Sequence, residues 1–304
     1  MIKFVNAKIN IGLQIVRRRE DGYHDLQTLF YPVGVYAGTP ENPVEFCDIL
    51  EITAHSRTSD DEPFMLRLSG NIIECPVEKN LVWKAAALFF NEFAPAGFGV
   101  SISLDKHLPD GAGLGGGSAD ASFTLTMLCD VAEEWAGSQG VSWRRPDEKR
   151  LLEAAARLGA DCPFFILNRA AYAEGIGERL RPVDIDLSGY WLVVVKPHIG
   201  VSTREAFAGV RPAEAGIDLR EICHLPPAEW RDKVINDFEK SIFPAFPDFP
   251  VIKDKIYETG ALYASLTGSG ACLYGIYSSE EAAAAAVSYL QLLPTISAIS
   301  LLKL

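Results

Sequence analysis

Alternating apolar and polar residues predict strands in several parts of the chain. Positions 9, 11, 13 and 15 are Ile or Leu, and they fall on one face of a strand, whereas Lys8 and Asn10 fall on the other face. Residues 100–104 alternate in the same way, and an apolar run at 191–195 predicts a further strand. One face of the first strand is therefore expected in the core, with Lys8 and Asn10 side by side on the opposite face.

Helical spacing follows the strand at 100–104. Apolar residues recur every three or four positions from Phe123 to Trp135, which predicts a helix. Similar patterns predict helices at 77–90, 146–158, 203–209, 227–242, 250–259 and 280–292, strands on both sides of Gly268, and a final strand at 295–302. This order predicts an α+β chain with a second domain that starts near residue 160.

A glycine-rich loop, residues 109–119, joins the strand at 100–104 to the helix that follows. Five of the seven positions from Gly111 to Gly117 are glycine, so few Cβ atoms keep the backbone N–H groups away from a ligand. The loop leads into a helix N-terminus, where unpaired N–H groups and the helix dipole attract anions. This context predicts a phosphate-binding loop.

Other interpretations of this loop fit the sequence less well. The loop lacks the G-K-[ST] ending of a Walker A motif. Gly111, Gly113 and Gly116 match G-x-G-x-x-G, but the acidic residues about twenty positions further on lie on or near the same predicted helix, not at the end of a second strand. A flexible linker is disfavoured because a strand and an amphipathic helix frame the loop.

The loop resembles the ATP-phosphate loop of the GHMP kinases, P-x-G-A-G-L-G-G-G-S-[SA]-D-A. The resemblance implies a two-domain α+β fold, with a ribosomal-protein-S5-domain-2-like α/β domain at 1–158 and a ferredoxin-like α+β domain at 159–304. It implies ATP and Mg²⁺ as cofactors, with Ser118 as a candidate Mg²⁺ ligand. The residues implied in phosphate binding are Pro109, Asp110, Gly111, Ala112, Gly113, Leu114, Gly115, Gly116, Gly117, Ser118 and Ala119.

A second motif, Gly159-Ala160-Asp161-Cys162-Pro163-Phe164-Phe165, also matches this superfamily. The residues alone favour Asp161 as the N-cap of a short helix that has Pro163 in its first turn. The resemblance implies that Asp161 is catalytic, and both roles are compatible. It also implies that Lys8 lies near Asp161 and near the γ-phosphate.

Residues 7–13 and 18–26 resemble the branch of the superfamily whose substrate joins cytidine diphosphate to methylerythritol. The implied reaction is phosphorylation of the 2-hydroxyl of that substrate in non-mevalonate isoprenoid synthesis. Tyr23 and Phe207 are implied to sandwich the cytosine, His24 to bind its edge, and Asn10 to hold the methylerythritol hydroxyls. The turn at 267–270 resembles a third motif that faces the active site, with Gly268 and Ser269 as substrate contacts, although a plain hairpin turn also fits. Another GHMP small-molecule kinase and a catalytically silent nucleotide-binding regulator remain alternatives.

Composition limits the partners of the chain. The chain has 304 residues, 48% hydrophobic and 22% charged, which is typical of a globular protein. The net charge of −12 argues against a nucleic-acid groove, so an anionic substrate must be met by local cations and N–H groups. The six cysteines form no C-x-x-C pair, which predicts reduced thiols and no cysteine-bound metal. With no membrane-length apolar run, the chain is expected in the cytoplasm, away from the membrane.

Overall fold

The computed structural model describes residues 1–34, 46–58, 60–71 and 76–304. Contacts divide the chain into two compact units, which we describe separately. The first unit contains residues 1–6, 47–110 and 116–168, and the second contains residues 7–46, 111–115 and 169–304. The domain boundary predicted near residue 158 stays a prediction. The Pro, Asp, Ser and Gly content of residues 37–48 and 55–64 predicts loops in both segments. Residues 37–45 and residue 59 lie outside the described ranges, and the prediction is wrong at the ends of the segments, where the strands Cys47–Ser56 and Phe64–Gly70 lie.

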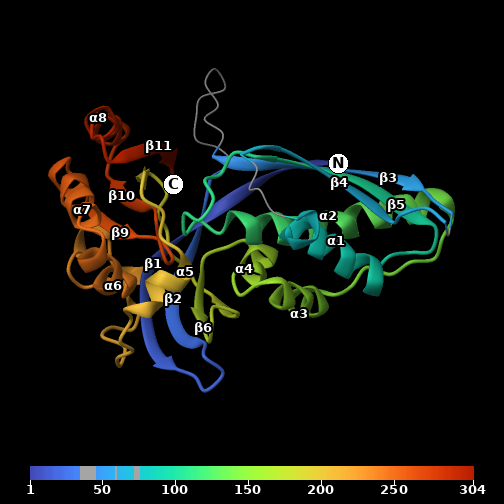
Figure 1. Ribbon diagram of the computed structural model, residues 1–304, viewed down its shortest axis with the longest axis horizontal. Coiled ribbons are helices and arrows are strands. Elements are labelled where there is room, and N and C mark those ends of the chain that lie inside the picture. Colours follow the sequence, from blue (N-terminus) through green and yellow to red (C-terminus); the bar gives the residue numbers. More distant parts are fainter. Residues whose placement is uncertain (35–45, 59, 72–75) are drawn as a thin grey trace. The chain divides into compact units, whose positions relative to one another are not determined.

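The first unit is a sheet with helices on one face (Figure 1). Its strand order is β4-β5-β3-β1, in which β4 and β5 are parallel and the other neighbours are antiparallel. Val100, Ile102 and Leu104 are at most 1% exposed, whereas Ser101 is exposed, which confirms the predicted alternation. The strands are β1 (Ile2–Arg18, of which residues 2–6 lie here), β3 (Cys47–Ser56), β4 (Phe64–Gly70) and β5 (Phe98–Lys106). The helices are η1 (Val77–Lys79), α1 (Leu81–Glu92), α2 (Gly116–Gln139), α3 (Glu148–Leu158) and α4 (Cys162–Leu167).

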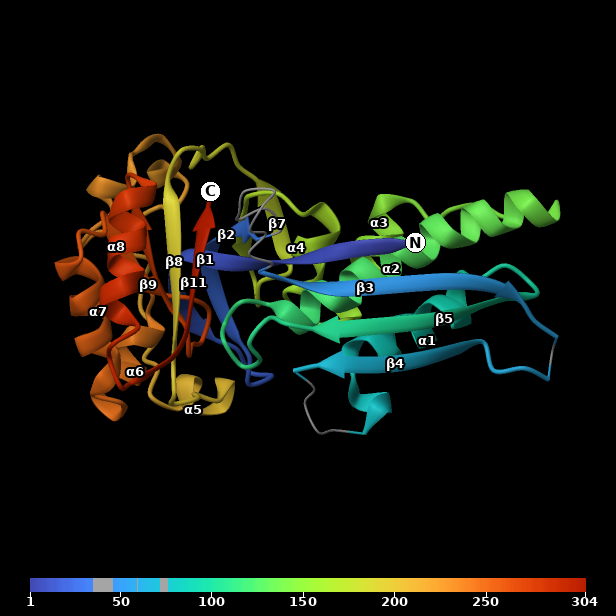
Figure 2. The ribbon, with the colours of Figure 1, turned by 90° about the horizontal axis from the view of Figure 1, so that it is seen from above.

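The second unit contains the rest of β1 and a separate sheet. From Ala7 onward β1 pairs with β2, which pairs with β6, which pairs with β7. The separate sheet has the order β11-β8-β10-β9, and α7 and α8 lie side by side on one of its faces (Figure 2). The strands are β2 (His24–Val33), β6 (Ala171–Glu174), β7 (Arg179–Pro182), β8 (Trp191–Pro197), β9 (Tyr263–Leu266), β10 (Leu273–Tyr277) and β11 (Ile296–Lys303). The helices are α5 (Thr203–Ala208), η2 (Glu221–His224), η3 (Pro227–Glu229), α6 (Phe238–Ala245), α7 (Asp248–Glu258) and α8 (Glu280–Leu290).

The helix predicted at 227–242 is wrong over most of its length. The structure has the short turn η3 and then α6, which begins only at Phe238. Between them the chain runs beside β1, where Leu13 N donates to Ile235 O at 3.0 Å and Asp237 N donates to Leu13 O at 2.7 Å. These hydrogen bonds to a strand replace the bonds that a continuous helix would make.

The helix predicted at 77–90 begins later, at Leu81. The Asn80 side chain accepts a hydrogen bond from Val82 N at 2.8 Å, and this cap starts α1 after the turn η1. Among the residues that the structure describes, no helix has both the length and the apolar character that a membrane span requires.

Candidate active site

The middle of the glycine loop, residues 111–115, belongs to the second unit and is bound there by backbone hydrogen bonds. Lys8 N donates to Leu114 O at 2.9 Å, and Ala271 N donates to Gly111 O at 3.1 Å. Gly111, Gly113 and Gly115 have φ values of 58°, 72° and 74°, a region that residues with a Cβ rarely adopt. The glycines therefore allow the loop to follow β1 and the segment after the 267–270 turn.

The predicted third motif lies against this loop. A Cβ placed on Gly113 would be 1.9 Å from the carbonyl oxygen of Thr267, so the two backbones meet at a distance that glycine alone permits. The Thr267 hydroxyl donates to Gly113 O at 3.0 Å. Ser269 lies next to Thr203, with 3.3 Å between the hydroxyl oxygens. The turn is therefore more than a plain hairpin connection, because it holds the glycine loop.

Lys8 lies in β1 and is 2% exposed. Its Nζ donates to Asn10 Oδ1 at 2.6 Å and to Gly113 O at 2.9 Å, and it lies 5.1 Å from the centre of the Phe30 ring. The structure thus brings the predicted lysine to the glycine loop.

Asn10 is 1% exposed and is hydrogen-bonded to protein groups on both ends of its amide. Besides Lys8, Oδ1 accepts from Gly268 N at 2.9 Å, and Nδ2 donates to Thr28 Oγ1 at 2.9 Å. These contacts indicate that Asn10 positions Lys8 and the 267–270 turn. Its predicted contact with substrate hydroxyls stays a prediction.

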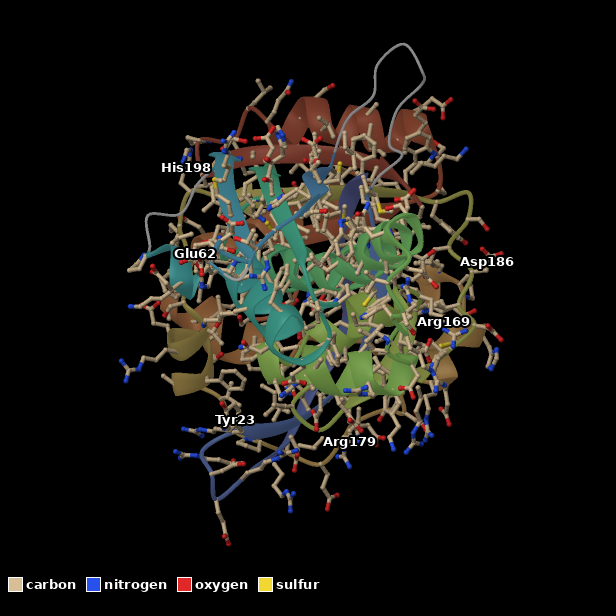
Figure 3. All side chains as sticks on the ribbon, turned by 90° about the vertical axis from the view of Figure 1, so that its right-hand side faces the viewer. Tyr23, Glu62, Arg169, Arg179, Asp186 and His198 are labelled. Atoms are coloured by element: carbon tan, nitrogen blue, oxygen red, sulfur yellow. The ribbon has the colours of Figure 1, made fainter. Side chains whose placement is uncertain are left out.

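The predicted base-binding residues come from the β1–β2 hairpin and from α5. The His24 and Phe207 rings are stacked, with centres 4.8 Å apart and planes 21° apart, and the Phe238 ring packs nearly perpendicular to the Phe207 ring. Burial, together with the Arg18 charge, lowers the pKa of His24, which favours the neutral ring. Tyr23 is 60% exposed at the end of the hairpin (Figure 3).

The two ends of the glycine loop belong to the first unit. Pro109 and Asp110 precede its middle part, and Gly116, Gly117, Ser118 and Ala119 form the start of α2. Ser118 is half-buried, and a Cβ on Gly159 would lie 3.8 Å from its hydroxyl oxygen. The Ser122 hydroxyl donates to Cys162 O at 2.7 Å. The start of α2 and the 159–162 segment are therefore neighbours within this unit.

Asp161 occupies the N-cap position of α4 and is half-buried. Its carboxylate makes no capping hydrogen bond to that helix, so the position predicted from the sequence is correct but the side chain does not cap. Burial raises the pKa of the neighbouring Cys162 thiol to about 11, which keeps that thiol neutral near pH 7. Asp161 and Lys8 belong to different units, and their predicted proximity stays a prediction.

The first unit also contains a buried ion cluster that no sequence motif predicts, formed by Asp48, Lys106 and Asp120. The Ser-Ala-Asp end of the loop motif was a signal for Asp120, but nothing in the sequence joined it to Asp48. Within the described part of the chain, no group of three or more His, Cys, Asp or Glu side chains has a metal-binding arrangement. The Ser118 side chain offers a hydroxyl oxygen at the loop, and Mg²⁺ prefers such hard oxygen ligands together with waters and phosphate oxygens. The role of Ser118 as a Mg²⁺ ligand stays a prediction.

Two protein-family models match separate segments of the chain. Residues 80–169 match the family described as GHMP kinases N terminal domain, and residues 211–293 match the family described as GHMP kinases C terminal. The first match includes the glycine loop and Asp161, and the second includes the 267–270 turn. The predicted α+β GHMP kinase fold is therefore confirmed.

Individual relatives narrow the family further. A 4-diphosphocytidyl-2-C-methyl-D-erythritol kinase of Bacteroides fragilis is 46% identical over 281 residues, which cover 92% of this chain and 93% of the relative. The enzyme of the same name from Parabacteroides distasonis is 45% identical and covers 91% and 92%. A crystal structure of a 4-(cytidine 5'-diphospho)-2C-methyl-D-erythritol kinase superposes with a TM-score of 0.77 at 30% identity and covers 99% of both chains. The chain therefore belongs to the GHMP kinases and, within them, to the family of 4-diphosphocytidyl-2-C-methyl-D-erythritol kinases.

Proposed function

We propose that this protein transfers the γ-phosphoryl group of ATP to the 2-hydroxyl of 4-diphosphocytidyl-2-C-methyl-D-erythritol, a step of non-mevalonate isoprenoid precursor synthesis. The observation that carries the proposal is the binding of the glycine loop to the buried Lys8 through Gly113. The names of the relatives support the choice of substrate. A cytoplasmic location belongs to the same proposal.

The glycine loop binds the ATP phosphates. Its left-handed glycines allow a ligand to approach the backbone, and the start of α2 adds the positive end of a helix dipole. Ser118, in the first turn of α2, contacts a phosphate oxygen or the Mg²⁺ ion. When bound, Mg²⁺ neutralises charge on the phosphates.

Lys8 and Asp161 have different roles in the transfer step. The buried ammonium of Lys8 stabilises negative charge on the phosphoryl group in transit, because a charge held in a dry site is weakly screened. Asp161 orients the acceptor hydroxyl in line with the phosphorus and accepts its proton as the new P–O bond forms and the bond to ADP breaks. Asn10 keeps the Lys8 ammonium in place.

The aromatic residues of the second unit bind the cytosine. The stacked His24 and Phe207 rings and the exposed Tyr23 ring offer flat faces and a ring nitrogen to a base. Ser269 and Gly268 lie on the turn that also holds the glycine loop, and they contact the acceptor from that side. A substrate without a base leaves these rings unused.

The direct test is phosphoryl transfer from Mg²⁺-ATP by the purified protein, with the cytidyl substrate, mevalonate and homoserine offered in parallel. We expect turnover of the cytidyl compound alone. Turnover of mevalonate or homoserine instead would assign the protein to another kinase activity and remove the roles of Tyr23, His24 and Phe207. Nucleotide binding without transfer to any acceptor would favour the silent regulator.

A further inference from the structure

Asp48, Lys106 and Asp120 form an ion cluster inside the first unit, which we call the loop tether. The Lys106 ammonium donates a hydrogen bond to Asp48 and a second one, of 2.7 Å, to Asp120 Oδ2. The side chains are 0%, 12% and 3% exposed for Asp48, Lys106 and Asp120. The cluster joins β3, the end of β5 and the second turn of α2.

The tether holds both ends of the glycine loop. Asp48 Oδ1 accepts hydrogen bonds from His107 N at 2.6 Å and from Leu108 N at 2.8 Å, the residues directly before Pro109. On the far side of the loop, Asp120 is the residue after Ala119. A Cβ on Gly116 would lie 3.5 Å from Lys106 Nζ, so the ammonium lies beside the start of α2. Lys106 therefore connects the residues before the loop to the helix after it.

Simple stabilisation of the fold explains the cluster poorly. Two carboxylates share one ammonium, and Asp120 Oδ1 is buried without a hydrogen-bond partner among the residues that the structure describes. Apolar residues of similar size often stabilise a core as well as a buried ion pair does. A buried charge cluster that adds little to the free energy of folding points to another role, namely to hold neighbouring backbone segments in a fixed position.

We propose that the loop tether sets the spacing between the two ends of the glycine loop, so that ATP meets a loop already in its binding conformation. Asp48, Lys106 and Asp120 are then positioning residues, which act on nucleotide affinity without touching the nucleotide. The inference rests on the proposed function, since it takes the loop as the phosphate site. Preorganisation improves affinity because the protein does not have to order the loop when the ligand binds.

Two substitutions of Asp120 separate the hydrogen bond from the charge. Asp120→Asn removes the surplus charge and keeps an oxygen for Lys106, whereas Asp120→Leu removes both, and Asp48 still neutralises Lys106 in each variant. We expect Asp120→Asn to bind a non-hydrolysable ATP analogue within about twofold of the wild type, because the hydrogen bond to the ammonium remains. We expect Asp120→Leu to raise the Kd of the analogue about tenfold, the loss typical of one charge-assisted hydrogen bond.

The matched control is Thr124→Val, which removes a buried hydroxyl one turn further along α2. It should lower the melting temperature and leave the Kd unchanged. In Asp120→Leu the KM for the cytidyl substrate should stay at the wild-type value while the Kd for the ATP analogue rises. A general loss of stability would not separate these two constants. If Asp120→Leu does not fold, Asp120→Ala gives the same comparison without added volume.

Two results would overturn the tether. An unchanged Kd in a folded Asp120→Leu or Asp120→Ala variant would show that the link does not act on the loop. Equal losses in Asp120→Asn and Asp120→Leu would assign the effect to charge. Wild-type protein that binds no nucleotide would contradict the proposed function and the tether together, whereas wild-type binding with no response to the variants would contradict the tether alone.

Discussion

At the residue scale, the proposed phosphoryl transfer depends on two groups whose chemistry differs because their surroundings differ. Lys8 is 2% exposed and donates to Asn10 and Gly113, so its ammonium is held at a fixed point beside the glycine loop. Asp161 is half-buried at the start of α4 and makes no capping bond there. A fixed cation and a carboxylate not used as a helix cap match the needs of phosphoryl transfer, in which positioning and charge stabilisation matter most.

Replacing Asp161 by Asn tests the carboxylate. The amide keeps the size of the side chain but accepts a proton far less readily, so we expect kcat to fall by about 10²- to 10⁴-fold. The Kd for ATP, measured by calorimetry, should not change, because the glycine loop is intact. Full activity in this variant would remove Asp161 from the mechanism.

At the element scale, the glycine loop is shaped by what it contacts in each unit. Residues 111–115 are bound to β1 and to residues 271–272, and the two flanks carry the loop tether. The Asn236 amide holds the 267–270 turn that contacts the loop, because Nδ2 donates hydrogen bonds of 2.9 Å to Leu266 O and to Gly268 O. The loop therefore relies on backbone and buried side-chain contacts on several elements.

Two alanine substitutions in this loop should differ in their effects. Both Gly111 and Gly113 have positive φ, which costs a residue with a Cβ about 1 to 2 kcal/mol. Gly111 has open space around it, so Gly111→Ala should lose only this amount of unfolding free energy. Gly113→Ala adds a clash with the Thr267 carbonyl, and we expect a loss of about 3 kcal/mol or more in urea titrations. Equal losses in the two variants would contradict the close approach of Gly113 to Thr267.

The sequence predicted the elements around the loop well and the contacts between distant side chains poorly. The strand at 100–104 and the strands beside Gly268 have local periodicity, which a pattern detects. The helix predicted at residues 230–237 is wrong because the conformation of this segment depends on hydrogen bonds to Leu13, more than two hundred positions away in the sequence. The pairing of Asp48 with Lys106 and Asp120 has the same origin, since no local pattern reveals which buried charges meet in space.

At the scale of the whole molecule, the proposed function requires an acidic chain to bind anionic substrates, which calls for local cations and N–H groups. A net charge of −12 repels ATP and a cytidine diphosphate compound. At 0.1 M salt this repulsion is largely screened at distances beyond about 10 Å. In the proposed function, Lys8, the loop glycines and the α2 N-terminus supply this local attraction. The buried charges of the loop tether also affect the unfolding free energy of the whole molecule, and this effect can be measured as a function of pH.

The tether predicts a pH dependence of the unfolding free energy. The pKa of Asp120 is raised to about 7 in the folded protein, first by burial, so the folded state holds a proton that the unfolded state loses near pH 4. Ionisation of this carboxyl thus reduces stability as pH rises from about 4 to about 7. Urea titrations of wild type and Asp120→Asn across that range should show the variant gaining relative stability with rising pH. A difference that does not change with pH would contradict the raised pKa.

Proton-coupled ³¹P NMR of the product shows which hydroxyl of the acceptor receives the phosphoryl group. The acceptor's carbon 2 carries a methyl group and no hydrogen, so a phosphate ester at this position has no proton three bonds from phosphorus. We predict one new phosphomonoester signal without that coupling, together with ADP. A doublet or triplet would place the phosphate on another hydroxyl, and the absence of any new ester signal would contradict the proposed kinase activity.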